Sequence, residues 1–193
     1  YTVATAIDGT LKACSLVGID PANATLAVVG ATGSIGKTCA IVLSRSFAKT
    51  ILIGRDMERT EAVTELVRNG VASVNVEDIR EADVLITVTS AGAEIVKPEH
   101  LKQGAIVCDV ARPRDVSVRV AKERPDVLVI EGGVVRIPGN VNFNFEFGFP
   151  PQTGYACMSE TIMLALDGRA EHFTLGKDVS VEQVEETRRL AMK

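Results

Sequence analysis

Three glycines at three-residue intervals are the first feature of this sequence that could do chemistry. They lie in the segment G-A-T-G-S-I-G at positions 30–36, which follows the apolar run T-L-A-V-V. Gly30 allows a tight exit from a strand, Gly33 lets the backbone approach a pyrophosphate, and Gly36 permits close helix–strand packing. The amides and dipole of a helix that begins at Ser34 attract the anion. We therefore predict a dinucleotide pyrophosphate site, with a plain turn as the alternative, formed by Gly30, Thr32, Gly33, Ser34, Ile35 and Gly36.

The residues after the second apolar run bear on the choice between NAD and NADP. A carboxylate at that strand end would hold the ribose 2′-hydroxyl, whereas an arginine accommodates a 2′-phosphate. The sequence places Gly54 where the acid is expected, with Arg55 directly after it and Arg59 close behind. A guanidinium can engage two phosphate oxygens at once. We therefore predict NADPH as the cofactor, with Arg55 and Arg59 as ligands, while Asp56 keeps NAD as an alternative.

Three later apolar runs also end in small or polar residues. They are followed by T-S-A-G at 89–92, D-V-A-R-P-R at 109–114 and E-G-G-V at 131–134. Since the carboxyl ends of parallel strands form the edge at which ligands of open α/β sheets bind, we expect these segments to meet at the cofactor. The expected ligands there are Thr89, Ser90, Gly132 and Gly133. An ordinary loop start is the alternative for Ser90 and Asp109, and turn formation alone would explain the glycine pair.

Cys157 is the candidate nucleophile. It lies near the start of a helix predicted at 153–166, where the helix N-terminus would stabilise a thiolate. Thiolate attack on a thioester would give an acyl-enzyme, and hydride from NADPH would release an aldehyde. A buried structural cysteine is the alternative that spacing alone favours. Glu160, one turn along, could orient or protonate a group there, whereas nothing in the spacing selects His172 or Lys177 as an acid.

Apolar runs alternate with helical patterns along most of the chain. This alternation predicts an α/β fold, a Rossmann-type doubly wound parallel sheet with additional N- and C-terminal helices. We expect one dinucleotide-binding domain over 1–193, with its core at about 24–133 and helical extensions at 1–18 and 152–193. Residues 134–151 are expected to form a loop or extended ribbon. Strands are expected at about 25–30, 50–54, 71–76, 84–89, 105–110 and 127–130, and helices at 34–46, 57–69, 153–166 and 181–192.

Composition narrows the classes of partner and compartment. The net charge of -4 disfavours nucleic acid, which requires a surplus of Lys and Arg. The four cysteines are scattered and only two histidines are present, so we expect no metal site and a reducing, cytoplasmic compartment. No apolar run approaches the ~18 residues of a membrane helix. The chain starts without Met and stops within a helical pattern, so we expect a piece of a longer protein.

Five segments resemble the carboxyl-terminal part of the long-chain fatty acyl-ACP reductases of cyanobacteria, in order and over nearly the whole chain. They are V-V-G-A-T-G-S-I-G, I-G-R-D-M-E-R, E-G-G-V-V, Y-A-C-M-S-E-T-I-M-L-A-L and F-T-L-G-K-D-V-S-V-E-Q-V-E-E. The resemblance implies reduction of a fatty acyl thioester to an aldehyde with NADPH, through a covalent acyl-cysteine. The family's A-C-x-x-E stretch matches residues 156–160, which makes Cys157 the nucleophile, and its arginine after the second strand matches Arg55. It also implies a further amino-terminal substrate domain. That domain or a homodimer partner could cover the apolar helix expected at 1–18 and the Phe-rich loop within residues 134–151.

A second resemblance points to a different reaction. The stretch D-V-A-R-P-R-D-V is similar to the NADP domain of glutamyl-tRNA reductases, and T-S-A occurs in shikimate-type dehydrogenases. This similarity implies an NADP-linked dehydrogenase that transfers hydride directly, with Cys157 in a structural role. A nucleotide-binding module without turnover is the third hypothesis.

Overall fold

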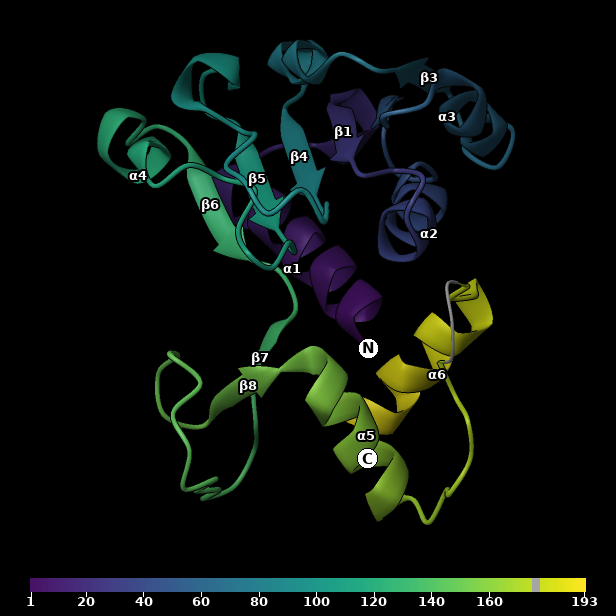
Figure 1. Ribbon diagram of the computed structural model, residues 1–193, viewed down its shortest axis with the longest axis vertical. Coiled ribbons are helices and arrows are strands. Elements are labelled where there is room, and N and C mark those ends of the chain that lie inside the picture. Colours follow the sequence, from purple (N-terminus) through teal and green to yellow (C-terminus); the bar gives the residue numbers. More distant parts are fainter. Residues whose placement is uncertain (175–177) are drawn as a thin grey trace.

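The computed structural model describes residues 1–174 and 178–193 and confirms the predicted parallel sheet (Figure 1). Six parallel strands are arranged in the order β3-β2-β1-β4-β5-β6. Their carboxyl ends are in register, because Thr87 pairs with both Val29 and Asp109, and Asp109 pairs with Glu131. The strands are β1 (Thr25–Val29), β2 (Lys49–Ile53), β3 (Gly70–Ser73), β4 (Val84–Thr87), β5 (Ile106–Asp109) and β6 (Leu128–Glu131).

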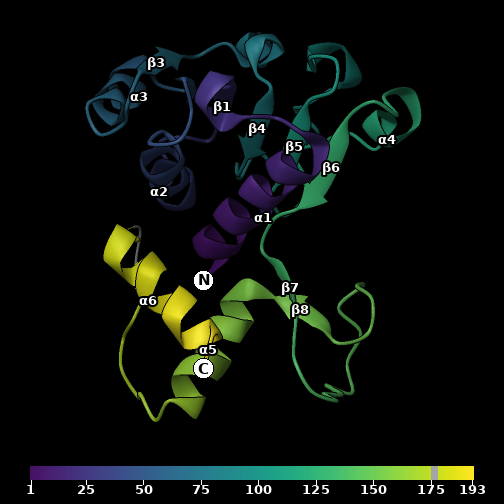
Figure 2. The same ribbon diagram turned by 180° about the vertical axis from the view of Figure 1, so that it is seen from behind.

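Helices cover both faces of the sheet, as in a doubly wound fold. Side chains alternate along each strand, so Leu26 and Val28 of β1 face one apolar cluster while Ala27 and Val29 face the other. Figure 2 shows α1 lying across the first of these faces beside α2. That face carries α1 (Thr2–Val17), α2 (Ser34–Leu43) and α3 (Met57–Thr64), and the other carries η2 (Val76–Glu81), η3 (Pro98–His100) and α4 (Arg119–Glu123), while η1 (Pro21–Asn23) precedes β1.

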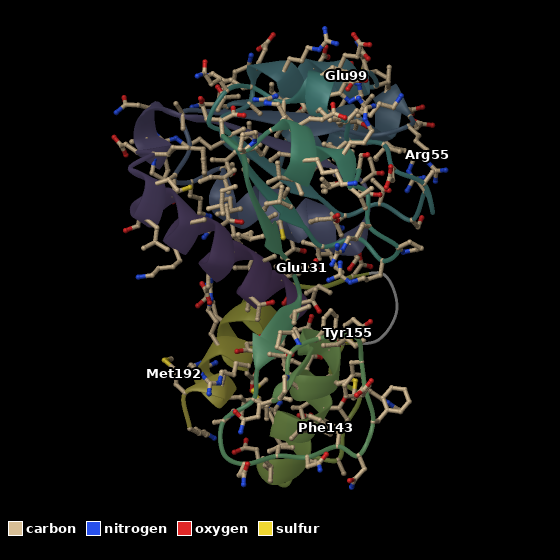
Figure 3. All side chains as sticks on the ribbon, turned by 90° about the vertical axis from the view of Figure 1, so that its left-hand side faces the viewer. Arg55, Glu99, Glu131, Phe143, Tyr155 and Met192 are labelled. Carbon is tan, nitrogen blue, oxygen red and sulfur yellow. The ribbon has the colours of Figure 1, made fainter. Side chains whose placement is uncertain are left out.

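A smaller unit follows the sheet and lies below its carboxyl edge. In Figure 3, Glu131 at the end of β6 lies above Tyr155, the residue that precedes α5. The unit holds an antiparallel pair, β7 (Val134–Arg136) and β8 (Thr153–Tyr155), and the helices α5 (Ala156–Leu166) and α6 (Val181–Ala191). Within residues 1–174 and 178–193, no helix has the length and apolarity that a bilayer crossing requires.

The predicted helix at 153–166 is wrong at its start. Residues 153–155 form β8 instead, because their backbone pairs with β7, with Val134 opposite Tyr155. The expected extended ribbon at 134–151 is therefore a hairpin whose second strand reaches Tyr155. The predicted helix at 57–69 ends earlier, at Thr64, because Leu66 and Val67 close tight three-residue turns with hydrogen bonds to Val63 and Thr64.

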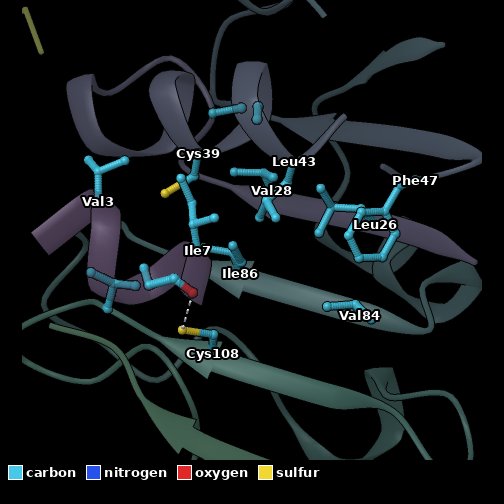
Figure 4. Packing of buried hydrophobic residues seen from close by; sticks show 14 of the residues in the cluster. Val3, Ile7, Leu26, Val28, Cys39, Leu43, Phe47, Val84, Ile86 and Cys108 are labelled. Atoms are coloured by element: carbon cyan, nitrogen blue, oxygen red, sulfur yellow. Dashed lines mark hydrogen bonds between the residues drawn. The ribbon is translucent and has the colours of Figure 1, made fainter. Parts of the chain in front are cut away.

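Helix α1 is part of the apolar core. Val3 and Ile7 are 3% and 1% exposed, and they pack against the same cluster as Cys39 of α2 and Cys108 of β5 (Figure 4). The helix also reaches the smaller unit, since the Arg188 guanidinium of α6 donates to Asp8 of α1 at 2.6 Å. Helix α1 thus ties the sheet to the unit that carries Cys157.

Candidate active site

Close packing explains the glycines of the phosphate turn at residues 30–36. Gly30 has a φ of +86°, and a Cβ there would lie 2.7 Å from the Val88 carbonyl oxygen. A Cβ on Gly36 would lie 2.3 Å from the Gly30 carbonyl oxygen, so α2 can approach β1 only with glycine at this position. The Gly33 amide donates to the same oxygen at 3.0 Å and closes the turn.

Helix α2 begins with unused hydrogen-bond donors. Its N-cap is Gly33, which has no side chain to accept from the first turn. In residues 1–174 and 178–193, the amides of Ser34, Ile35 and Gly36 have no hydrogen-bond acceptor. Free amides and a positive dipole end are the features by which helix N-termini bind phosphate. The turn can therefore receive a pyrophosphate.

The end of β2 has no room for an acidic side chain. A Cβ on Gly54 would lie 2.2 Å from the Thr60 hydroxyl oxygen and 3.1 Å from Cγ2 of Thr32. The nearby Asp56 carboxylate is already engaged, since it accepts the Arg59 amide at 3.0 Å as the N-cap of α3. The Arg55 side chain is exposed, and the described part of the chain offers neither it nor Arg59 an ion-pair partner. This arrangement suits a 2′-phosphate better than a 2′-hydroxyl.

Asp115 orders the loop that follows β4, and sequence patterns alone did not select it. Its buried carboxylate accepts hydrogen bonds from the Thr89 amide at 2.9 Å, from the Thr89 hydroxyl at 2.6 Å and from the Thr87 hydroxyl. The Thr89 hydroxyl is therefore turned inward, whereas Ser90 is exposed at the rim. Asp115 is visible in the A-R-P-R-D stretch, but no spacing rule connects it with a threonine 26 residues away.

Asp109 has a structural role at the end of β5. Its carboxylate accepts the amides of Ala111 at 3.0 Å and Val116 at 3.1 Å, which shapes the connecting loop. Burial raises the pKa of this carboxyl above its ordinary value, although the two amides act in the opposite direction. The loop-start alternative therefore describes Asp109. The residues that the structure describes hold no group of three or more His, Cys, Asp or Glu side chains placed to bind a metal.

The glycine pair after β6 has a packing explanation. A Cβ on Gly132 would lie 2.4 Å from Cγ2 of Val110, and Gly133 has a φ of +73°. Both glycines are buried, and a Cβ on Gly133 would lie 3.0 Å from Cγ2 of Thr2. Their contact with a nicotinamide ring stays a prediction.

Cys157 lies beside this glycine pair. The Ala156 amide donates to the Gly133 carbonyl at 2.8 Å, which fixes the start of α5 to the end of β6. Cys157 is the second residue of α5 and is exposed, so the buried-cysteine alternative does not describe it. Among the described residues, the amides of Cys157 and Met158 meet no acceptor. An exposed thiol, free helix amides and the sheet edge are thus brought together.

The other acids and bases do not join this group. Glu160 is only 8% exposed, and its carboxylate accepts a hydrogen bond from the Thr174 hydroxyl. It is therefore engaged on the inner side of α5 rather than free beside the thiol. His172 is exposed beyond the end of α5, and Lys177 lies outside the described residues.

Comparison with known proteins supports both resemblances. The family model for shikimate / quinate 5-dehydrogenase matches residues 13–131. Aminotransferase PigE from a Serratia species is 31% identical over 188 residues, which are 93% of this chain and 22% of PigE. The long-chain acyl-[acyl-carrier-protein] reductase of Synechococcus elongatus is 30% identical over 182 residues, 90% of this chain and 52% of the reductase. The chain thus spans between about a fifth and a half of these two relatives.

Solved structures share the fold. A dipicolinate synthase from Bacillus halodurans aligns with a TM-score of 0.57 and 20% identity, over 68% of this chain and 46% of that one. Glutamyl-tRNA reductase from Methanopyrus kandleri aligns with a TM-score of 0.55 and 23% identity, over 67% and 34%. The family match runs through all six strands of the sheet and includes the phosphate turn. The chain is therefore homologous to the cyanobacterial long-chain acyl-ACP reductase and belongs to the shikimate / quinate 5-dehydrogenase family of nicotinamide-dependent oxidoreductases.

Proposed function

We propose that this chain is the NADPH-binding and nucleophile-bearing part of a reductase that converts a fatty acyl thioester into an aldehyde. The observation that carries the proposal is the position of Cys157, exposed on the first turn of α5 and held at the sheet edge by the bond between Ala156 and Gly133. Similarity to the Synechococcus reductase over nine-tenths of the chain supports the acyl thioester as substrate class.

In the proposed reaction, acyl transfer to Cys157 precedes reduction of the acyl group. The Cys157 thiolate attacks the carbonyl carbon of the thioester, the bond to the carrier sulfur breaks, and the carrier leaves as a thiol after taking up a proton. The amides of Cys157 and Met158, which meet no acceptor among the described residues, would donate hydrogen bonds to the oxyanion that forms. NADPH, when bound, supplies the hydride that reduces the acyl group on Cys157. The bond between carbon and Sγ then breaks, which releases the aldehyde and restores the thiolate.

The residues present fit NADPH. The amides of Ser34, Ile35 and Gly36 would hold the pyrophosphate, and Arg55 and Arg59 would hold the 2′-phosphate. The steric block at Gly54 supports this preference over NADH, because a ribose-binding carboxylate has no space there.

Arg55→Ala tests the 2′-phosphate assignment. Loss of charge-assisted hydrogen bonds worth about 1.5–3 kcal/mol weakens NADPH binding by roughly 10- to 100-fold. Binding of NADH, which lacks the phosphate, stays at its wild-type level. Fluorescence titration of both nucleotides measures the two constants. Arg68→Ala serves as control and leaves both constants unchanged, because it removes an exposed arginine just before β3, at the amino ends of the strands rather than the carboxyl ends. Equal weakening of NADPH and NADH binding by Arg55→Ala contradicts the assignment.

Mass spectrometry after incubation with a long-chain acyl thioester, without NADPH, tests the reaction itself. We expect one acyl group per molecule, mapped to Cys157, and its loss after pretreatment with iodoacetamide. The other three thiols are buried, and burial raises the pKa of Cys14 and Cys39 and raises the pKa of Cys108 to about 11. They are therefore poor nucleophiles at neutral pH. The absence of any adduct in the intact protein would exclude the acyl-cysteine route.

The family match favours a second candidate, an NADP-linked dehydrogenase that transfers hydride directly to a small keto-acid. This candidate needs no thiol, so it requires turnover that survives alkylation of Cys157. The same alkylated protein, assayed for NADPH oxidation, separates the two functions. Tight NADPH binding without turnover on either substrate class would leave a binding module.

A further inference from the structure

A pocket of about 770 Å³ lies along α5, on the same side of the helix as Cys157. At 100° per residue, Thr161 and Leu164 lie within about 40° of Cys157 around the helix axis. Both line the pocket, whose nearest wall residues begin one turn beyond the sulfur. The facing wall is the segment 168–174, which follows α5. The pocket therefore begins about one helical turn beyond Cys157 and continues towards the carboxyl end of α5.

The lining of this pocket suits an uncharged ligand. Leu164 and Ala165 of α5 face Ala170 and Phe173 of the opposite wall. The Arg169 guanidinium is paired with Glu171 and Glu186 and lies 5.1 Å above the Phe173 ring. The Glu160 carboxylate is engaged with Thr174. Because these charges are balanced within the wall, the described part of the lining offers mainly apolar surface to a ligand, with His172 as its one further titratable side chain. Its volume lies in the usual range for small-molecule sites, about 300–1,000 Å³.

The aromatic loop at 137–152 is a poorer place for such a ligand. Its rings pack edge-to-face on one another and on Tyr155. The ring centroids of Phe145 and Phe147 lie 5.0 Å apart, and those of Phe149 and Tyr155 lie 5.1 Å apart. Figure 1 shows this loop beside β7 and β8, whereas the segment after α5 leaves on the other side.

We propose that the α5 pocket holds the alkyl chain of the acyl group carried by Cys157, so that its depth sets the accepted chain length. This inference rests on the proposed function. At 1.5 Å per residue, Thr161 lies about 6 Å and Ala165 about 12 Å along the helix from Cys157. The pocket thus accommodates an extended chain of many methylene groups, and side chains placed at these two positions define two depths.

Tryptophan substitutions at positions 161 and 165 test how deep the acyl chain reaches into the pocket. The intact protein and its Thr161→Trp and Ala165→Trp variants are incubated with butyryl-, octanoyl- and palmitoyl-coenzyme A, and the rate of acylation of Cys157 is followed by mass spectrometry. Ala165→Trp slows palmitoyl transfer about tenfold, because the bulky side chain prevents burial of about two methylene groups. The rate of octanoyl transfer stays unchanged. Thr161→Trp slows octanoyl transfer as well, and both variants keep the butyryl rate, which shows that they are folded.

Leu166→Trp is the matched control. Leu166 is 84% exposed and lies half a turn around α5 from Cys157, so its replacement leaves all three rates unchanged. If the pocket variants slow acylation by all three thioesters equally, or if neither variant slows it, the assignment of the pocket to the alkyl chain is wrong. The acyl-cysteine intermediate is unaffected by that result. Absence of adduct with every thioester in the unmodified protein instead overturns the proposed function, and the pocket assignment with it.

Discussion

Cys157→Ala abolishes thioester reduction, lowering its rate by at least about 10³-fold, and leaves NADPH binding unchanged. The expected loss is large because the thiol forms the covalent bond to the acyl group, and no other thiol in the described residues is exposed. Cofactor binding survives because the phosphate turn belongs to β1 and α2, whereas Cys157 belongs to α5. Aldehyde formation and nucleotide titration, measured on the same preparation, give both quantities.

Cys39→Ala is the control for this experiment. It also removes one thiol, but Cys39 is fully buried in α2 and burial raises its pKa, so it takes no part in acyl transfer. The variant loses stability through a small cavity and keeps its activity per folded molecule. If Cys157→Ala retained full reductase activity, hydride transfer would proceed without an acyl-cysteine and the dehydrogenase candidate would replace our proposal.

Gly36→Ala damages both the fold and the cofactor site. The new Cβ would lie 2.3 Å from the carbonyl oxygen and 2.9 Å from the carbonyl carbon of Gly30. Because both are backbone atoms, relief requires α2 to move away from β1. We expect a loss of about 1–3 kcal/mol in the free energy of unfolding, from denaturant titration. Displacement of the free amides weakens NADPH binding by about 100-fold, as loss of charged hydrogen bonds does.

Gly33→Ala separates these two effects. Its Cβ would meet only the Gly30 carbonyl oxygen, at 3.3 Å, and the φ of −79° is ordinary for alanine. The fold should therefore tolerate this change, with stability close to that of the wild type. The methyl group still stands where the pyrophosphate approaches, so NADPH binding weakens. Wild-type NADPH affinity in Gly33→Ala would mean that residues 30–36 form a plain structural turn.

The order of elements was predictable because its signals are local. Short β-branched runs, each followed by a turn and a helical pattern, indicate a parallel sheet whatever lies elsewhere in the chain. The phosphate turn is equally local, since strand, glycines and helix are adjacent in sequence. The resemblance to the acyl-ACP reductases placed Cys157 in a reactive position, which spacing alone did not, and the structure places that residue in the open at the start of α5.

Contacts between distant residues decided the rest. We expected residues 153–155 to begin the helix at 153–166, yet they form a strand because β7, about 20 residues earlier, offers a row of backbone partners. The hydrogen bonds from Thr89 to the buried carboxylate of Asp115 join two loops that are distant in sequence. A buried carboxylate requires hydrogen-bond donors, and the tertiary fold decides which residues supply them.

Glu160 shows the same limit at the site. Its spacing from Cys157 suggests a partner for the thiol, but the packing of α5 turns its carboxylate inward to Thr174. At Gly54, the sequence indicates only a missing acid, while the structure supplies the reason in the Thr60 hydroxyl and the Thr32 methyl group. The sequence by itself determined the sheet, its phosphate turn and the candidate nucleophile, because each is indicated by a pattern of residues that are close together in the chain. Only the tertiary structure decided what each polar side chain faces, because that depends on which distant segments share its surroundings.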